Sequence, residues 1–220
     1  MKNIDETKQK LISSAMRLYK RYGYANVTIE QICEAVGIAK NTYYYHFESK
    51  DALLLAYLLE QKDLTVQALG DVLFTEQNNF EKFWFIQKKR IAVLLDCGID
   101  IICHLRDMKT VHSAFAAQHK EGALTLEAKI IKAAQADGTV RNQTDSLSLT
   151  AAGAMLFCGV LIIWIAMDGV FDLEQAVRSG FENLFDVRPD LRHGKDLYAY
   201  LLSTVQKQRK NNVKEKTNAR

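Results

Sequence analysis

Apolar residues return every three or four positions along most of this chain, which is the pattern of amphipathic helices packed against a core. The first apolar stripe ends at Gly23, a residue that favours helix termination, and comprises Leu11, Ala15, Leu18, Tyr19 and Tyr22. Similar stripes predict helices over residues 80–98, 101–108 and 121–136, and Asp172 opens another amphipathic segment. The pattern therefore predicts an all-α fold.

Residues 28–47 predict two short helices joined by a tight turn. Thr28 and Gln31 have the spacing of a capping box, which indicates a helix over 28–35. Gly37 can adopt the left-handed conformation that a tight turn needs, and a second helix is expected over 39–47. Two short helices about a glycine turn form a helix-turn-helix. Ser49 is placed to cap the next helix, which carries the apolar run 52–59.

The second of these short helices divides into two faces. One face is expected to pack inward and carries Ala39, Tyr43 and Phe47, while the opposite face carries Lys40, Asn41, Tyr44, Tyr45 and Glu48. The major groove of DNA admits one helix, in which an Asn can read adenine and a Lys can read guanine or contact a phosphate. His46 lies near the inner face, where a packed side chain and a phosphate contact remain alternatives.

The 22 residues from Ser146 to Met167 contain no charge, and this length would suffice to cross a bilayer. A membrane span, the central helix of a monomer core and a subunit interface are the three alternatives. Acidic Asp145 and Asp168 flank the run, no Lys/Arg cluster marks a cytoplasmic side, and its first third is rich in small residues. These features favour a helix buried between subunits, where small side chains permit close helix approach.

Composition and charge support a soluble helical protein that contacts a polyanion at one end. A single proline and 11 glycines suit long helices with few breaks. Residues 1–50 carry eight Lys/Arg against five Asp/Glu, and residues 204–220 carry six against one, so the middle of the chain is acidic. The basic end segment is interpreted as a frayed terminus rather than a DNA contact. Four cysteines without a CxxC pair, and no apolar leader, predict a reducing, cytoplasmic location.

Sequence motifs give little support to an enzyme, a cofactor or a metal site. The chain has no GxSxG, Walker-type glycine loop, HExxH or CxxC. His112 and His119 share a helix face but would lie about 10 Å apart along it, too far to hold one ion. We therefore expect a protein that is not an enzyme and has no cofactor, although a helical enzyme without a recognisable motif stays as an alternative.

The helix-turn-helix segment resembles the TetR family of transcriptional regulators. The resemblance covers about 50 residues and lies in Thr28-Ile29-x-x-Ile32, Ala35-Val36-Gly37-Ile38 and the block from Lys40 to Leu53. It implies that the sugar-phosphate backbone is contacted by Thr28, Thr42, Tyr44, His46 and Lys50, whereas Lys40, Asn41 and Tyr45 face bases. Ala39 stands where the family often has a capping Ser, and Tyr43 where it often has Leu. We expect Tyr43 to bring its hydroxyl toward the groove edge.

The resemblance also implies a division of the chain. Residues 1–48 would form a three-helix DNA-binding domain, residues 49–210 an effector-binding and dimerisation domain with a connecting helix at 49–72, and residues 211–220 a disordered basic tail. The expected function is a cytoplasmic repressor that binds a palindromic operator in double-stranded DNA as a homodimer, without a membrane, and is released by a small-molecule effector. A helix over 196–209 is also expected, with no assigned role.

Two further groups of residues are candidates for binding. Polar side chains on apolar faces suggest an effector pocket built from Trp84, Gln87, His104, Met108 and Phe115, with a role in the core as the alternative. In the family, the last two helices pair with their copies in a second subunit. The corresponding dimer interface would use Ala151, Ala154, Gly159, Ile163, Val177, Phe181 and Leu184.

Overall fold

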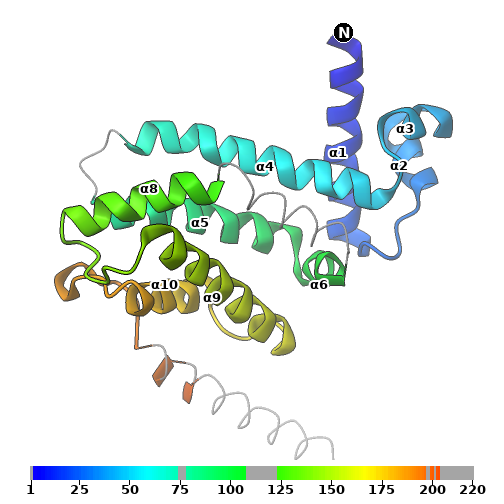
Figure 1. Ribbon diagram of the computed structural model, residues 1–220. Helices are drawn as coiled ribbons and strands as arrows, with labels where there is room; N and C mark the ends of the chain where they lie inside the picture. The colour runs from blue at the N-terminus through cyan, green and yellow to red at the C-terminus, as the bar shows by residue number, and fades with distance from the viewer. Residues whose placement is uncertain (1, 74–77, 108–122, 197–198, 201, 204–220) are drawn as a thin grey trace, which may run out of the picture. The chain divides into compact units, whose positions relative to one another are not determined.

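Helices account for nearly all regular structure in the computed structural model, which describes residues 2–73, 78–107, 123–196, 199–200 and 202–203 (Figure 1). The helices are α1 (Lys2–Tyr22), α2 (Ile29–Val36), α3 (Lys40–His46), α4 (Lys50–Leu73), α5 (Asn79–Cys97), α6 (Ile99–Asp107), α8 (Ala123–Ala136), α9 (Ser146–Ala166) and α10 (Leu173–Leu184). Among the described residues, β-structure is limited to one isolated antiparallel bridge between Val140 and Val187. The all-α prediction is confirmed.

The chain divides into two compact units, each with its own core. The first comprises the described parts of residues 1–71 and 92–113, and the second those of residues 72–91 and 114–220. In the first unit, α1 to α3, the beginning of α4 and α6 enclose one apolar cluster. Its fully buried members are Leu11, Ala15, Ile32, Tyr43, Leu53, Leu54 and Ile101. Most of the stripe predicted for the first helix therefore lies in this core.

Local sequence signals set the ends of α2. Thr28 accepts a hydrogen bond from the Gln31 amide at 3.2 Å, and the Gln31 side chain accepts one from the Thr28 amide at 2.8 Å. The predicted capping box is thus confirmed. Gly37 ends α2 with φ of +75°, which is the left-handed conformation expected of it, and its amide donates to the carbonyl of Cys33.

Helix α4 begins where the sequence predicted. The amide of Ala52 donates to Ser49 Oγ at 3.1 Å, so Ser49 supplies the expected cap, and Asp51 lies in the first turn. Figure 1 shows that α1 runs across α4 and that α2 and α3 lie beside α1. Buried Leu53 and Leu54 secure the beginning of α4 to this group of helices.

The second unit is organised around α9, which contacts both α8 and α10. Its core is aromatic: Phe80, Phe83, Phe181 and Phe185 have ring centroids 5.2–6.3 Å apart in tilted, edge-on and stacked pairs. Gly153 on α9 permits the close approach of α10, because a Cβ there would lie 3.0 Å from Phe181. Asp172 caps α10 by accepting from the Gln175 amide at 3.0 Å.

One face of α9 is apolar yet exposed. Met155 is 75% exposed, and the exposed fractions of Leu147, Ile162 and Ile163 are 51%, 53% and 49%. The inner side of the helix contributes to the core, whereas no part of the described chain covers its apolar outer side. By length and composition α9 is the one described helix that could cross a membrane, a test that the core helix of a soluble protein also passes.

Candidate nucleic-acid interface

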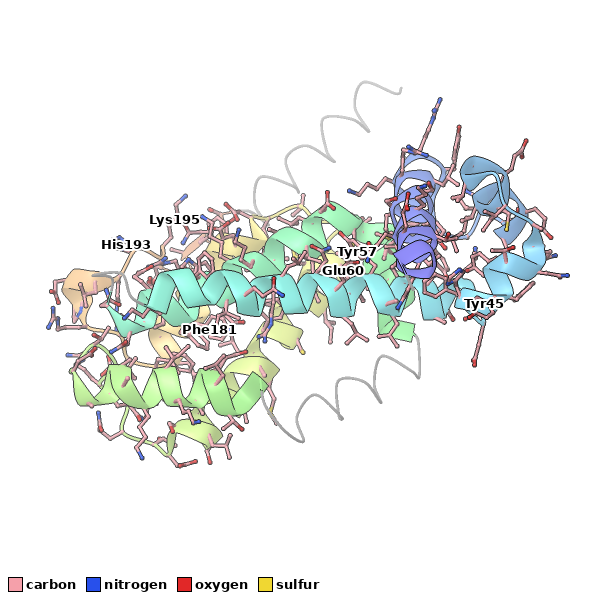
Figure 2. All side chains as sticks on the ribbon, turned by 90° about the horizontal axis from the view of Figure 1, so that it is seen from above. Tyr45, Tyr57, Glu60, Phe181, His193 and Lys195 are labelled. Atoms are coloured by element: carbon pink, nitrogen blue, oxygen red, sulfur yellow. The ribbon has the colours of Figure 1, made fainter. Side chains whose placement is uncertain are left out.

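Helix α3 presents a polar and aromatic face to solvent. Lys40, Asn41 and Tyr44 are exposed, and Tyr45 is the most exposed of the three consecutive tyrosines, at 71%. Figure 2 shows Tyr45 pointing away from the rest of the unit. Thr42 and His46 are half-buried at the edge of this face. The structure therefore brings the residues predicted on α3 together on one exposed surface, which we call the α3 face (Lys40, Asn41, Thr42, Tyr44, Tyr45 and His46).

Buried aromatic residues hold α3 in place from the other side. Tyr43 is fully buried and Phe47 is 5% exposed, so both occupy the inward positions predicted for them. The Tyr43 hydroxyl donates to the Ser49 carbonyl at 3.0 Å, which joins α3 to the start of α4. The expectation that this hydroxyl reaches the groove edge was wrong, because the hydrogen bond directs it into the fold. Burial also raises the pKa of Tyr43 above the ordinary tyrosine value.

Ala39 differs from its predicted inward position. It precedes α3 as the N-cap residue, is exposed, and makes no side-chain hydrogen bond to the helix. The missing cap that the sequence indicated is therefore real, although Ala39 contributes nothing to the inner face. The first amides of α3 are left without the side-chain acceptor that a Ser would provide.

Lys40 is paired before any ligand is present. Its ammonium contacts the carboxylate of Glu30 on α2, and both side chains are at least half exposed. This contact lowers the pKa of Glu30 and raises that of Lys40. Sequence reasoning missed Glu30, because the two residues are ten positions apart and meet only through the turn at Gly37. Glu30 therefore holds Lys40 at the edge of the α3 face.

Thr28 and Lys50 flank the α3 face in different ways. Thr28 is exposed at the N-terminus of α2, where backbone amides and the helix dipole favour an anion such as a phosphate. Lys50 is half-buried, and its ammonium donates to the carbonyls of Tyr24 at 2.8 Å and Val27 at 2.6 Å. Burial lowers the pKa of Lys50, although the charge of Asp51 opposes this effect. Lys50 thus secures the turn before α2, a role that the sequence did not suggest.

The candidate effector residues are distributed over both units. Trp84 and Gln87 are buried in the second unit, whereas His104 belongs to the first; Met108 and Phe115 lie outside the described residues. The Gln87 side chain donates to Glu127 at 2.9 Å and accepts from Arg90 at 3.0 Å. His104 is engaged with Asp51 through Nε2 at 2.8 Å.

Glu127 is an important polar residue that sequence reasoning missed. It is 5% exposed, lies on α8, and pairs with Arg90 on α5 as well as with Gln87. Nothing in its sequence context signals burial, because it occurs among alternating polar and apolar positions.

Trp84 contacts a different arginine. The guanidinium of Arg178 lies over the Trp84 ring, 5.1 Å from the ring centroid.

The candidate dimer residues fall into two groups. Ile163 is exposed, and Ala151, Ala154 and Gly159 are half-buried on α9. Gly159 has nothing within 4 Å of the position of an added Cβ, so space remains beside it. Val177 and Phe181 differ from the prediction: they are 0% and 1% exposed and pack within their own chain. Leu184 is half-buried at the end of α10.

No cluster of three or more His, Cys, Asp or Glu side chains suitable for a metal ion occurs among the described residues. The four cysteines are free thiols, and burial raises the pKa values of Cys33, Cys97 and Cys158. The described residues therefore offer the α3 face as the surface with the most evident binding chemistry.

Comparison with known proteins gives three kinds of similarity. Residues 11–57 match the family model described as bacterial regulatory proteins, tetR family. A 53-residue segment is 42% identical to the HTH-type transcriptional regulator YerO of Bacillus subtilis, and 66 residues are 30% identical to RutR of Escherichia coli. The segment shared with YerO covers 24% of this chain and 18% of YerO, and the segment shared with RutR covers 30% of this chain and 31% of RutR. The chain therefore matches less than a third of the length of each of these relatives.

Solved structures resemble the chain over most of its length. A TetR transcription regulator from Haloarcula marismortui has a TM-score of 0.65 at 17% identity and covers 83% of this chain and 97% of its own. A transcriptional regulator from Saccharomonospora viridis in complex with choline has a TM-score of 0.62 at 20% identity, with coverage of 83% and 96%. At these identities the likeness shows the fold, an N-terminal helix-turn-helix followed by a helical domain.

Proposed function

We propose that this chain is a cytoplasmic transcriptional regulator of the tetR family whose α3 face binds an operator in double-stranded DNA. The match of residues 11–57 to the model of bacterial regulatory proteins, tetR family, supports this proposal. The observation that carries the proposal is the sorting of α3, in which Tyr43 and Phe47 are buried while Asn41 and Tyr45 are exposed. A seven-residue helix with this division commits its inner side to the fold and leaves its outer side for recognition.

The proposed division of labour separates positioning from reading. Thr28, Thr42, Tyr44, His46 and Lys50 contact the sugar-phosphate backbone, and Lys40, Asn41 and Tyr45 face base edges. Asn41 has the amide chemistry that suits adenine, and Lys40 suits guanine or a phosphate. Lys50 has first to leave the carbonyls of Tyr24 and Val27 if its ammonium is to meet a phosphate directly. Because contacts with the DNA phosphates release bound counterions, we expect the affinity for DNA to be higher at low salt.

We propose that the regulator acts as a homodimer through the exposed apolar face of α9. A patch that includes Met155, Ile162 and Ile163 is costly to leave in water, and a second copy of the same helix would cover it. Ala151, Ala154 and Gly159 let the two backbones approach closely. We place Leu184 at the edge of this contact. Two α3 faces related by a twofold axis would suit an operator with inverted half-sites.

We propose further that the regulator is a repressor and that a small-molecule effector, bound in the second unit, releases it from the operator. The polar cluster of Gln87, Arg90 and Glu127 beside buried Trp84 gives the second unit hydrogen-bonding groups in an apolar setting. Arg90 is 41% exposed, so a cationic or hydrogen-bonding ligand can compete with it for Glu127. A structural neighbour was solved with choline and another with lauroyl-CoA, which shows that this fold accommodates chemically different ligands.

Selection from a random duplex library tests the proposal. The full-length protein is incubated with duplexes at moderate salt, and bound DNA is amplified and sequenced over several rounds. We expect enrichment of an inverted repeat whose half-sites are about 10 base pairs apart, or a multiple of that spacing. A Tyr45→Ala, Asn41→Ala double variant serves as the control and should enrich nothing in common with the wild type. Absence of any enriched sequence would overturn the proposal.

A further inference from the structure

Helix α6 lies within the same compact unit as the helix-turn-helix, although it follows α5 in the chain. Ile101 and Leu105 are 1% and 6% exposed, and both belong to the apolar cluster that contains Leu11, Ile32 and Tyr43. Cys97, at the end of α5, is buried in the same cluster. The core that supports α2 and α3 is therefore completed by α6.

Asp100 of α6 contacts the turn that follows α1. Its carboxylate oxygen Oδ2 accepts a hydrogen bond from the amide of Tyr24 at 3.2 Å. Gly23 allows this approach for two reasons: its φ is +82°, and a Cβ at that position would lie only 3.0 Å from the same oxygen. The glycine that ends α1 is therefore also the site at which α6 meets the backbone.

His104, one turn further along α6, contacts the same tyrosine and the start of α4. Its ring stacks on Tyr24 with centroids 4.1 Å apart and an interplanar angle of 26°. Its Nε2 lies 2.8 Å from Asp51 Oδ1, and the Tyr24 hydroxyl donates to that same oxygen. Because Asp51 Oδ1 is an acceptor, Nε2 carries the proton in this contact.

Asp51 is the meeting point of these side chains. Burial raises its pKa, but hydrogen bonds from Tyr24 and His104, together with the charges of His104 and Lys50, outweigh this effect and lower it. Lys50 adds a further link, because its ammonium lies 4.3 Å from the centroid of the Tyr24 ring and donates to the Tyr24 carbonyl. Tyr24 is thus held at its amide, its carbonyl, its ring face and its hydroxyl.

We infer that Asp100 and His104 form a clamp that positions the helix-turn-helix for DNA binding, with Tyr24 as the residue clamped. The turn containing Tyr24 leads directly to Thr28 and α2, so its position sets where α2 begins. Asp51 belongs to the first turn of α4, so the clamp relates the beginning of α2 to the beginning of α4. This inference rests on the proposed DNA binding, and it replaces an effector contact as the role of His104.

If the contact between His104 and Asp51 served only global stability, its loss would lower the free energy of unfolding without a specific effect on DNA binding. The side chains of His104 and Asp51 are 35% and 44% exposed, and a polar contact that accessible contributes little to global stability. A clamp acts instead on the conformation of one turn. Its removal should loosen residues 23–27 and weaken binding to the specific operator more than binding to unrelated DNA, which depends on charge.

The experiment compares His104→Leu, His104→Gln, Asp51→Asn and the His104→Leu, Asp51→Asn double variant with the wild type. Asp96→Asn is the matched control, because it removes an exposed carboxylate from an ion pair with Lys20 in the same unit. Two measurements are made: amide hydrogen exchange of residues 23–27 in the free protein, and affinity for the selected and scrambled duplexes. Circular dichroism confirms folding, and His104→Gln retains a donor if the Leu variant unfolds.

We expect His104→Leu to increase exchange in residues 23–27 and to reduce affinity for the selected duplex about fivefold or more, with little change on the scrambled duplex. The double variant should lose no more than the larger single loss, because both changes open one contact. His104→Gln should recover part of the affinity. Exchange and affinity equal to those of Asp96→Asn, or fully additive losses, would overturn the clamp. Hydrogen exchange is measured on the free protein and does not depend on DNA binding. If the proposed DNA binding is wrong, the wild type itself will not prefer the selected duplex, and this outcome is distinct from failure of the clamp.

Discussion

Three consecutive tyrosines in α3 show how strongly position governs the role of a side chain. Tyr43 is fully buried and hydrogen-bonded to the Ser49 carbonyl, while Tyr44 and Tyr45 are 47% and 71% exposed. The 3.6-residue period of a helix is sufficient to explain this division, which the sequence predicted. The direction of the Tyr43 hydroxyl was not predictable, because it depends on the backbone at the start of α4.

Lys50 gives the prediction that belongs to the residue scale. Replacement by Met retains the aliphatic length but removes the ammonium that donates to the carbonyls of Tyr24 and Val27. We expect Lys50→Met to lower the free energy of unfolding by about 1.5–3 kcal/mol, the usual range for hydrogen bonds to a charged group. Urea denaturation followed by circular dichroism measures this. Lys40→Met is the control, because Lys40 has only an exposed partner in Glu30.

The same variant decides whether Lys50 also meets a phosphate. If it does, the slope of log affinity against log salt should decrease in magnitude by about one unit on any duplex. Unchanged stability together with an unchanged slope would contradict both the backbone contact and the proposed phosphate contact.

At the scale of elements, α9 and α10 depend on a glycine where they approach each other. A Cβ on Gly153 would lie 3.0 Å from Phe181 and 3.1 Å from Phe185, and both rings are confined in the aromatic core. We expect Gly153→Ala to destabilise the protein by about 1–2 kcal/mol, because overpacking exceeds the gain in helix propensity. Gly70→Ala in α4 is the control: nothing lies within 4 Å of its added Cβ, and it should stabilise by about 0.5–1 kcal/mol. Equal effects of the two substitutions in urea denaturation would contradict this packing.

The N-terminus of α3 gives a second prediction at this scale. Ala39 occupies the N-cap position with an extended backbone and no side-chain hydrogen bond. We expect Ala39→Ser to raise the free energy of unfolding by about 1 kcal/mol, because its hydroxyl can accept from an amide in the first turn. Ala35→Ser, at an exposed position in the last turn of α2, should give no such gain. If both variants changed the free energy of unfolding equally, a side-chain cap at position 39 would not be what stabilises α3.

The elements were largely predictable, but the contacts between distant segments were not. Caps at Thr28, Ser49 and Asp172 have sequence signatures, so the starts of α2, α4 and α10 could be placed within a residue. Val177 and Phe181 were assigned to a subunit interface because periodicity identifies an apolar face without showing what covers it. His104 illustrates the same limit, since its partners Asp51 and Tyr24 lie far away in sequence. The predicted helix over 196–209 falls mostly outside the described residues.

At the scale of the whole molecule, the exposed face of α9 calls for an explanation. Its apolar residues would be buried by a second copy of the chain or by a bilayer, and these alternatives have different experimental signatures. We expect the wild type to remain soluble without detergent and to sediment at micromolar concentration with twice the 25.0 kDa mass of the chain. A monomer, or a protein found only in the membrane fraction, would contradict the proposed dimer.

A charged substitution locates the dimer contact. Met155→Arg places a cation at the most exposed apolar position of α9 and should shift the protein to the monomer without unfolding it. Ala133→Arg on α8 is the matched control, since Ala133 is exposed outside this face, and it should remain dimeric. Bismaleimide cross-linking through Cys158, which is half-buried on α9, should decrease in parallel with the dimer.

If the exposed side of α3 reads DNA sequence, Asn41 should determine the preference at a single base position. Wild type and Asn41→Ala are titrated, at one salt concentration, against the selected duplex, its single-base variants and a scrambled duplex. We expect Asn41→Ala to lose about 1–3 kcal/mol of preference at one base position in each half-site and to retain its affinity for the scrambled duplex. An Asn41→Ala protein with wild-type affinity and wild-type preference at every base would contradict sequence reading by the α3 face.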